Sequence, residues 1–154
     1  MMGICSFPIA GTKGHNMRRP AIAVKPQPPY DISSFSPPGV SLSNNMMIAR
    51  FHHGPSALTY LWFYKQVKGH GPWDYKNILG RQYENFGNFH FGAVGIAAGI
   101  EPEILLRAAG LAQILAGTSD PSFKNYQGPD SHGDDPTDQT WIRAGIDYAQ
   151  RSGF

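Results

Sequence analysis

The chain has 154 residues, a length typical of one domain, so we expect a single hydrophobic core. Charged residues make up only 16% of the chain, and the 18 Gly and 13 Pro require many turns, which excludes a long coiled coil. The net charge of +2 is too small for the strong positive field of a dedicated duplex-DNA binder, so any contact with nucleic acid must be local.

The cysteine content and the N-terminus indicate the class of protein. Cys5 is the only cysteine, which excludes an intramolecular disulfide and a cysteine-based zinc site. The N-terminal residues lack the apolar run of a secretory signal, and no stretch reaches the ~18 consecutive apolar residues of a membrane-spanning helix. We therefore expect a soluble protein without a membrane-spanning segment, made in the cytoplasm without a signal peptide. Contractile (type VI) and other specialised secretion systems export proteins that lack such a signal, so the place of action stays open.

The first 40 residues differ in composition from the rest. Seven of the 13 prolines lie between Pro8 and Pro38, and the stretch shows neither strand nor helix periodicity. We expect residues 1–40 to form a proline-rich extended arm or linker outside the core, and residues 41–154 to form the folded domain.

After residue 40 the apolar residues recur at helical spacing. Ser41 or Ser43 can cap the first helix, and Ser56 can cap the second. The second helix is apolar on nearly all faces, so we expect it to be central. Pro102 lies in the first turn of a later helix, where proline is favoured. The helices are expected over residues 41–51, 56–68, 73–86, 101–115 and 136–151.

Residues 86–100 combine aromatic residues and glycines with a run of small residues. This pattern favours a tight turn that leads into a closely packed helix, and a short β-hairpin is the alternative. The expected fold is a compact, predominantly α single domain, with a hairpin at most as its only β-structure.

The stretch GPWDYK at residues 71–76 lies at a loop–helix junction. Asp74 can hold or activate a group there, with Tyr75 beside it, while Lys76 can stabilise a developing negative charge. The alternative is structural: Asp74 caps the third helix, Trp73 packs against it and Lys76 is solvated.

Glu84 and His90 are the titratable residues near the aromatic segment. Surrounding rings would favour the neutral form of Glu84, as a general acid requires, whereas the alternative is a solvated helix carboxylate. A lone histidine such as His90 is more often a hydrogen-bonded core residue than a catalyst.

Asp134, Asp135 and Asp138 offer oxygen ligands for a divalent cation. The same residues around Pro136 are typical of a capped helix start, which is the favoured interpretation. No Walker loop, GxGxxG, HExxH or GxSxG motif is present, so we expect no required cofactor beyond a cation at this cluster.

Several stretches together resemble the polymorphic toxin type 44 domain, also called bacterial toxin 44. The resemblance covers residues 37 to about 150, with the same order and approximate spacing of pieces. The matching pieces are PPGVSLSNN (37–45), WFYKQVKGHGPWDYK (62–76), YENFGNFHFGAVGIAAGI (83–100), ILLRAAGLAQ (104–113), GTS (117–119) and GDDPTDQTWIRAGIDY (133–148).

The resemblance implies an antibacterial effector that a secretion-system carrier delivers into a competitor and that a cognate immunity protein neutralises in the producer. It also implies ribonuclease activity. At position 90 similar domains often carry Asn, so the resemblance does not imply a general base at His90. The family motif positions in this chain are Trp73, Asp74, Tyr75, Lys76, Tyr83, Glu84, Phe86, Asn88, Phe89, Asp134, Asp135, Asp138 and Gln139.

Two enzyme hypotheses and one other follow. In a ribonuclease, Asp74 or Glu84 activates the ribose 2′-hydroxyl, Lys76 or Arg81 stabilises the phosphorane, and aromatic rings stack on bases in the recipient's cytoplasm. In a lysozyme-like or lytic transglycosylase-like peptidoglycan hydrolase, Glu84 protonates the glycosidic oxygen with help from Asp74 in the periplasm. A non-enzymatic interaction module is the third hypothesis. The expected substrate-binding residues are Trp73, Tyr83, Asn88, Phe89 and Arg81.

Overall fold

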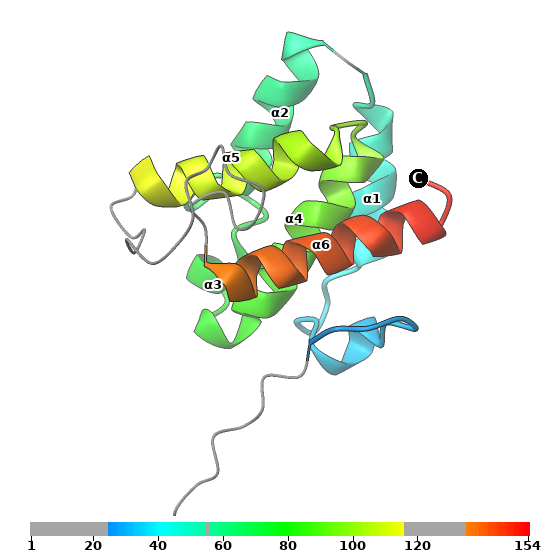
Figure 1. Ribbon diagram of the computed structural model, residues 1–154, viewed down its shortest axis with the longest axis vertical. Coiled ribbons are helices and arrows are strands. Elements are labelled where there is room, and N and C mark those ends of the chain that lie inside the picture. Colours follow the sequence, from blue (N-terminus) through cyan, green and yellow to red (C-terminus); the bar gives the residue numbers. More distant parts are fainter. Residues whose placement is uncertain (1–24, 55, 116–134) are drawn as a thin grey trace, which may run out of the picture.

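The computed structural model describes residues 25–54, 56–115 and 135–154, and all regular structure within them is helical (Figure 1). The predominantly α fold is thereby confirmed. The alternative of a hairpin at residues 86–100 is wrong, because most of this stretch lies in one helix. The elements are η1 (Ile32–Ser34), α1 (Leu42–Phe51), α2 (Ala57–Val67), α3 (Tyr75–Ile78), η2 (Arg81–Tyr83), α4 (Glu84–Ala97), α5 (Pro102–Leu115) and α6 (Pro136–Arg151).

Three predicted helix starts are confirmed by side-chain caps. The Ser41 hydroxyl accepts a hydrogen bond from a backbone N–H in the first turn of α1, and Ser56 does the same for α2. The Asp135 carboxylate accepts a hydrogen bond from the Thr137 N–H at 2.7 Å, with Pro136 in the first turn of α6. Each cap satisfies an N–H group that the helix itself leaves without a partner.

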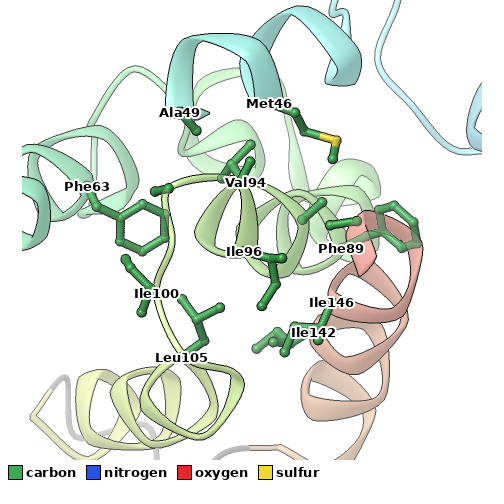
Figure 2. Packing of buried hydrophobic residues seen from close by; sticks show 14 of the residues in the cluster. Met46, Ala49, Phe63, Phe89, Val94, Ile96, Ile100, Leu105, Ile142 and Ile146 are labelled. Atoms are coloured by element: carbon green, nitrogen blue, oxygen red, sulfur yellow. The ribbon is translucent and has the colours of Figure 1, made fainter. Parts of the chain in front are cut away.

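The core is built around α4, which packs closely against α6 and also contacts α1 and α5. Figure 2 shows Met46 of α1 on one side of α4 and Ile142 and Ile146 of α6 on the other. Glycines allow the closest approach: a Cβ at Gly92 or Gly145 would collide with the backbone of the opposite helix. The small residues in residues 86–100 therefore serve helix packing, as predicted.

The expectation that the second helix is central is wrong. Only Thr59 and Phe63 of α2 are buried, while Leu58 and Tyr64 are 76% and 61% exposed. Figure 1 shows α2 at the upper edge of the molecule, far from α6. An apolar sequence on all faces does not by itself distinguish a central helix from a peripheral one, because it carries no information about which neighbours are present.

The predicted third helix is divided into three elements. Gly80 has φ +126°, a conformation that a helix cannot contain and that side chains rarely adopt, so α3 ends before it. The short η2 follows, and α4 begins at Glu84. Glu84 therefore lies at the start of a helix, not near the end of one.

Part of the predicted arm belongs to the core. The Phe35 ring contacts the Phe89 and Trp141 rings, with centroids 5.2 and 5.1 Å apart, and Pro37 is buried. The Tyr30 hydroxyl donates a 2.7 Å hydrogen bond to Asp147 of α6. The predicted exclusion from the core is thus wrong for this part, while residues 1–24 lie outside the described residues.

Candidate functional site

The loop between α2 and α3 is held by Asp74. Its carboxylate accepts hydrogen bonds from the His70 backbone N–H at 2.7 Å and from the Asn77 side chain at 2.6 Å. His70 has φ +60°, and a Cβ at Gly71 would collide with backbone carbonyls at the end of α2. Asp74 therefore fixes a tight turn. It occupies the N-cap position of α3, as the structural alternative predicts, but makes no side-chain cap hydrogen bond.

Lys76 and Glu84 form an ion pair across the turn at Gly80. Lys76 Nζ lies 2.8 Å from Glu84 Oε1, and the two side chains are 41% and 32% exposed. Glu84 is the first residue of α4, where the helix dipole favours a negative charge. The turn thus brings together a carboxylate and an ammonium group that both remain accessible to solvent.

The aromatic enclosure that was expected around Glu84 is not found. Phe86 and Phe89 are fully buried in the core, whereas the Glu84 carboxylate is partly exposed and paired with Lys76. The rings and the carboxylate leave α4 on different sides, because residues two and five positions apart on a helix face different directions. Glu84 is thus an ion-paired carboxylate in a polar environment.

A buried polar network includes Tyr75, the residue directly before Lys76. The Asn45 side-chain Nδ2 is 2.8 Å from the Tyr75 hydroxyl oxygen and 3.0 Å from His90 Nε2. The Tyr75 and His90 side chains are almost fully buried, and the Trp73 ring stands edge-on to the imidazole, with centroids 5.0 Å apart. With Asn45 as the donor to both, His90 Nε2 accepts and the ring proton resides on Nδ1.

Burial determines the protonation of this network. It lowers the pKa of His90 to about 3. Burial also raises the pKa of Tyr75 to about 12, although the hydrogen bond from Asn45 acts in the opposite direction. Both groups are therefore neutral at pH 7. Both side chains are buried, so neither is placed to contact a substrate in this structure.

Asn45 is a member of this network that the sequence did not single out. The only feature of the sequence that pointed to Asn45 was its place at the end of the stretch PPGVSLSNN. The pairing with Tyr75 joins residues 30 positions apart, and the pairing with His90 joins residues 45 positions apart. No local pattern reports such a contact.

Asn88 and Asp138 join α4 to α6 one helical turn beyond Glu84. The Asn88 side chain donates a 2.8 Å hydrogen bond to the Asp138 carboxylate. Asp135 caps α6, so the predicted helix start is confirmed, and Asp134 lies outside the described residues. In the described part of the chain no three His, Cys, Asp or Glu side chains are grouped to hold a metal ion.

The other predicted substrate-binding residues differ in access. Arg81 is exposed on η2, next to the ion pair in sequence, and Trp73 and Tyr83 are half-buried. Phe89 is 0% exposed and contacts Tyr30 and Phe35, so it is a core residue here. No helix within the described ranges is long and apolar enough to span a bilayer.

The comparison with known families gives one result. A family model described as bacterial toxin 44 matches residues 77–151, a range that begins directly after Lys76 and includes Glu84, Asn88 and Asp138. Neither a curated protein nor a solved structure matches the chain. This match confirms the resemblance drawn from the sequence over residues 77–151, which are similar to the bacterial toxin 44 family, whereas the pieces at residues 37–76 lie outside the matched range.

Proposed function

We propose that this chain is an antibacterial toxin that cleaves RNA in a competing cell, with the Lys76–Glu84 pair as its catalytic centre. The family match over residues 77–151 supports a bacterial toxin, for which a cognate immunity partner is expected. The observation that carries the reaction is the 2.8 Å pairing of a partly exposed carboxylate with a partly exposed ammonium group. A carrier of a specialised secretion system would deliver the toxin.

The proposed reaction is a transesterification that uses the ribose 2′-hydroxyl. The Glu84 carboxylate accepts the proton of that hydroxyl, whose oxygen then attacks the adjacent phosphorus. Lys76 stabilises the negative charge that develops on the phosphoryl oxygens. The bond from phosphorus to the 5′-oxygen breaks, water supplies the proton of the leaving oxygen, and Glu84 releases its proton to solvent. The products are a 2′,3′-cyclic phosphate and a 5′-hydroxyl.

The surroundings of the pair support RNA as the substrate. The exposed guanidinium of Arg81 can bind a neighbouring phosphate, as a local basic group in a weakly basic domain. Trp73 and Tyr83 are half-buried and offer aromatic faces for splayed bases. Asn88 lies one helical turn beyond Glu84 on the same side of α4.

Peptidoglycan cleavage is supported less well. A glycosidase requires a protonated carboxyl group and a second carboxylate at the bond that breaks. Glu84 is paired with an ammonium group, and the Asp74 carboxylate already accepts two hydrogen bonds within its loop. Phe86 and Phe89, the rings that follow Glu84 in sequence, are buried in the core and offer no face to a sugar ring.

The test is cleavage of purified RNA by the full chain and by Glu84→Gln and Lys76→Met variants. Each variant should lower the rate by roughly 10²- to 10⁴-fold, since each removes one group that acts in the transition state. The matched control is the ion pair between Glu103 and Arg107 on α5, at 2.9 Å. Glu103→Gln and Arg107→Met variants should cleave RNA at the wild-type rate, and circular dichroism should show that all four variants fold.

Three outcomes would replace the proposal. Release of glycan fragments from purified cell wall, lost in Glu84→Gln, would establish the peptidoglycan hydrolase. Activity that a chelator abolishes and Mg²⁺ restores would favour a cation at Asp134, Asp135 and Asp138, because the proposed reaction requires no cofactor. A chain that cleaves neither polymer but still arrests growth would favour the non-enzymatic interaction module.

A further inference from the structure

The end of α1 and the outer side of α2 form an apolar projection, which we call the α1–α2 apex. It consists of Phe51, Leu58, Leu61 and Tyr64, whose exposed fractions are 92%, 76%, 50% and 61%. Isolated exposed apolar residues are ordinary, but several large ones on two adjacent elements mark an interaction site. No contact within the described chain accounts for them.

The α1–α2 apex is held in place by the opposite side of α2. His52 stacks on Trp62 with ring centroids 3.9 Å apart, and the Thr59 hydroxyl donates a 2.8 Å hydrogen bond to the His52 carbonyl. The Phe63 ring packs against Phe91 at 5.3 Å. These contacts fix which side of α2 faces outward, so the exposed side chains are presented together.

Along the outer side of α2 the side chains change from apolar at its start to basic at its end. Leu58 and Leu61 lie in its first turns, Tyr64 follows, and Lys65 and Lys68 lie at its end. The spacing of three and four residues places Leu58, Leu61, Lys65 and Lys68 on one side of the helix. At ~1.5 Å per residue, roughly 15 Å separate the apolar end from the basic end.

The charges within the stretch that forms the α1–α2 apex have one sign. The stretch 32–73 contains no Asp or Glu, whereas it contains Arg50, Lys65 and Lys68. Among the described residues neither lysine takes part in an ion pair. The stretch that forms the apex therefore complements an anionic surface, although the whole chain is only weakly basic.

We infer that the α1–α2 apex docks on the surface of an anionic lipid bilayer. Phe51, Leu58 and Leu61 enter the boundary between headgroups and acyl chains, and Lys65 and Lys68 reach the lipid phosphates. Tyr64 lies between them at the level of the headgroups, where amphipathic rings are favoured. An acidic protein would also match the charge, but only a membrane surface has apolar, interfacial and anionic layers in the order that α2 presents. The inference is independent of the reaction proposed at Lys76 and Glu84.

Vesicle co-sedimentation of the full chain tests this inference. Vesicles of mixed phosphatidylglycerol and phosphatidylcholine should bind the chain, whereas pure phosphatidylcholine should bind it weakly, and added salt should reduce binding. The double variant Phe51→Ser/Leu58→Ser should weaken binding at least tenfold, and Lys65→Gln/Lys68→Gln should weaken it about fivefold per lysine. The controls are Ile104→Ser on α5 and Lys25→Gln, which remove an exposed apolar residue and an exposed lysine elsewhere and should bind as wild type.

A second measurement reports insertion itself. The fluorescence of a Leu58→Trp variant should be quenched by vesicles that contain brominated lipids, beyond any quenching of wild type, whereas an Ile104→Trp variant should show no extra quenching. Absence of vesicle binding would overturn the inference, as would binding that the apex variants leave unchanged. Without vesicle binding, self-association that the apex variants abolish would identify a second copy as the occupant. Capture of a purified acidic protein by the apex alone would identify that protein instead.

Discussion

At the scale of single residues, the interior depends on the polar network of Asn45, Tyr75 and His90. Asn45 lies within hydrogen-bond distance of both partners, and among the described residues no partner is found for His90 Nδ1. An imidazole in this position is stable only in its neutral form, because a second proton would place a charge in an apolar environment.

The protonation of His90 predicts a pH dependence of stability. The pKa of His90 is about 3 in the folded chain, against an ordinary value of 6.5. Between these values the unfolded chain binds a proton that the folded chain does not, so the free energy of unfolding falls as the pH falls. The slope from this one group is at most about 1.4 kcal/mol per pH unit.

Urea unfolding between pH 7 and pH 4.5, for wild type and for His90→Asn, measures this contribution. The asparagine cannot titrate, so the wild-type stability should fall more steeply with decreasing pH than that of the variant. The difference between the two slopes removes the contributions of all other groups. Parallel slopes would show that His90 does not remain neutral when folded.

At the scale of elements, the crossing of α4 and α6 determines the packing of the domain. Phe89 and Ile142, whose side chains are buried, also supply the backbone atoms that lie closest to the opposing glycines. Gly145 leaves no space for a side chain, because its Cβ would overlap the Phe89 carbonyl oxygen. The two helix axes thus approach at a distance that only glycine permits.

Gly145→Ala should therefore be strongly destabilising. The added methyl group forces the two backbones apart, and we expect the free energy of unfolding to fall by about 2–3 kcal/mol. The matched control is Gly87→Ala on α4, where a Cβ meets nothing within 4 Å. That variant should gain about 0.5–1 kcal/mol, because alanine is the better helix former. Chemical denaturation of both variants measures the contrast, and equal effects would contradict this account of the crossing.

The elements also show what the sequence could and could not predict. The starts of α1, α2 and α6 were predictable because Ser41, Ser56 and Asp135 act on N–H groups within three residues of themselves. The division of the third helix was not, since Gly80 has φ +126° only in the folded chain. The expected continuous helix over residues 73–86 would place Lys76 and Glu84 on one side, but their proximity in the structure arises from the turn that interrupts that helix.

At the scale of the whole molecule, the described N-terminal residues close the core over α4 and α6. The Tyr30 hydroxyl reaches an aspartate 117 positions away in the sequence. The Phe35 ring lies against Phe89 and also 6.2 Å from Phe86, two residues after Glu84. The packing of these residues against the core could not be predicted from a proline-rich stretch without periodicity. Single aromatic residues can be buried without forming part of a regular element.

This packing predicts that the arm is required for stability. Phe35→Ala should lower the free energy of unfolding by about 2–3 kcal/mol, since a largely covered ring is lost. Ser33→Ala, an exposed change in η1 (Ile32–Ser34) just before Phe35, should have an effect within about 0.5 kcal/mol. Deletion of residues 1–40 should destabilise the chain more than Phe35→Ala does, because it also removes Tyr30 and the buried Pro37.

Thermal unfolding measured by circular dichroism ranks the three variants, and RNA cleavage by Phe35→Ala at low temperature adds a second readout. Phe35 touches Phe86 but neither Lys76 nor Glu84, so the folded variant should retain the wild-type rate while its melting temperature falls. A deletion variant that melts with the full chain would show that residues 30–37 rest on a core that is already complete. In that case α4 and α6 would need no cover from the N-terminal residues, and the domain would begin near Ser41.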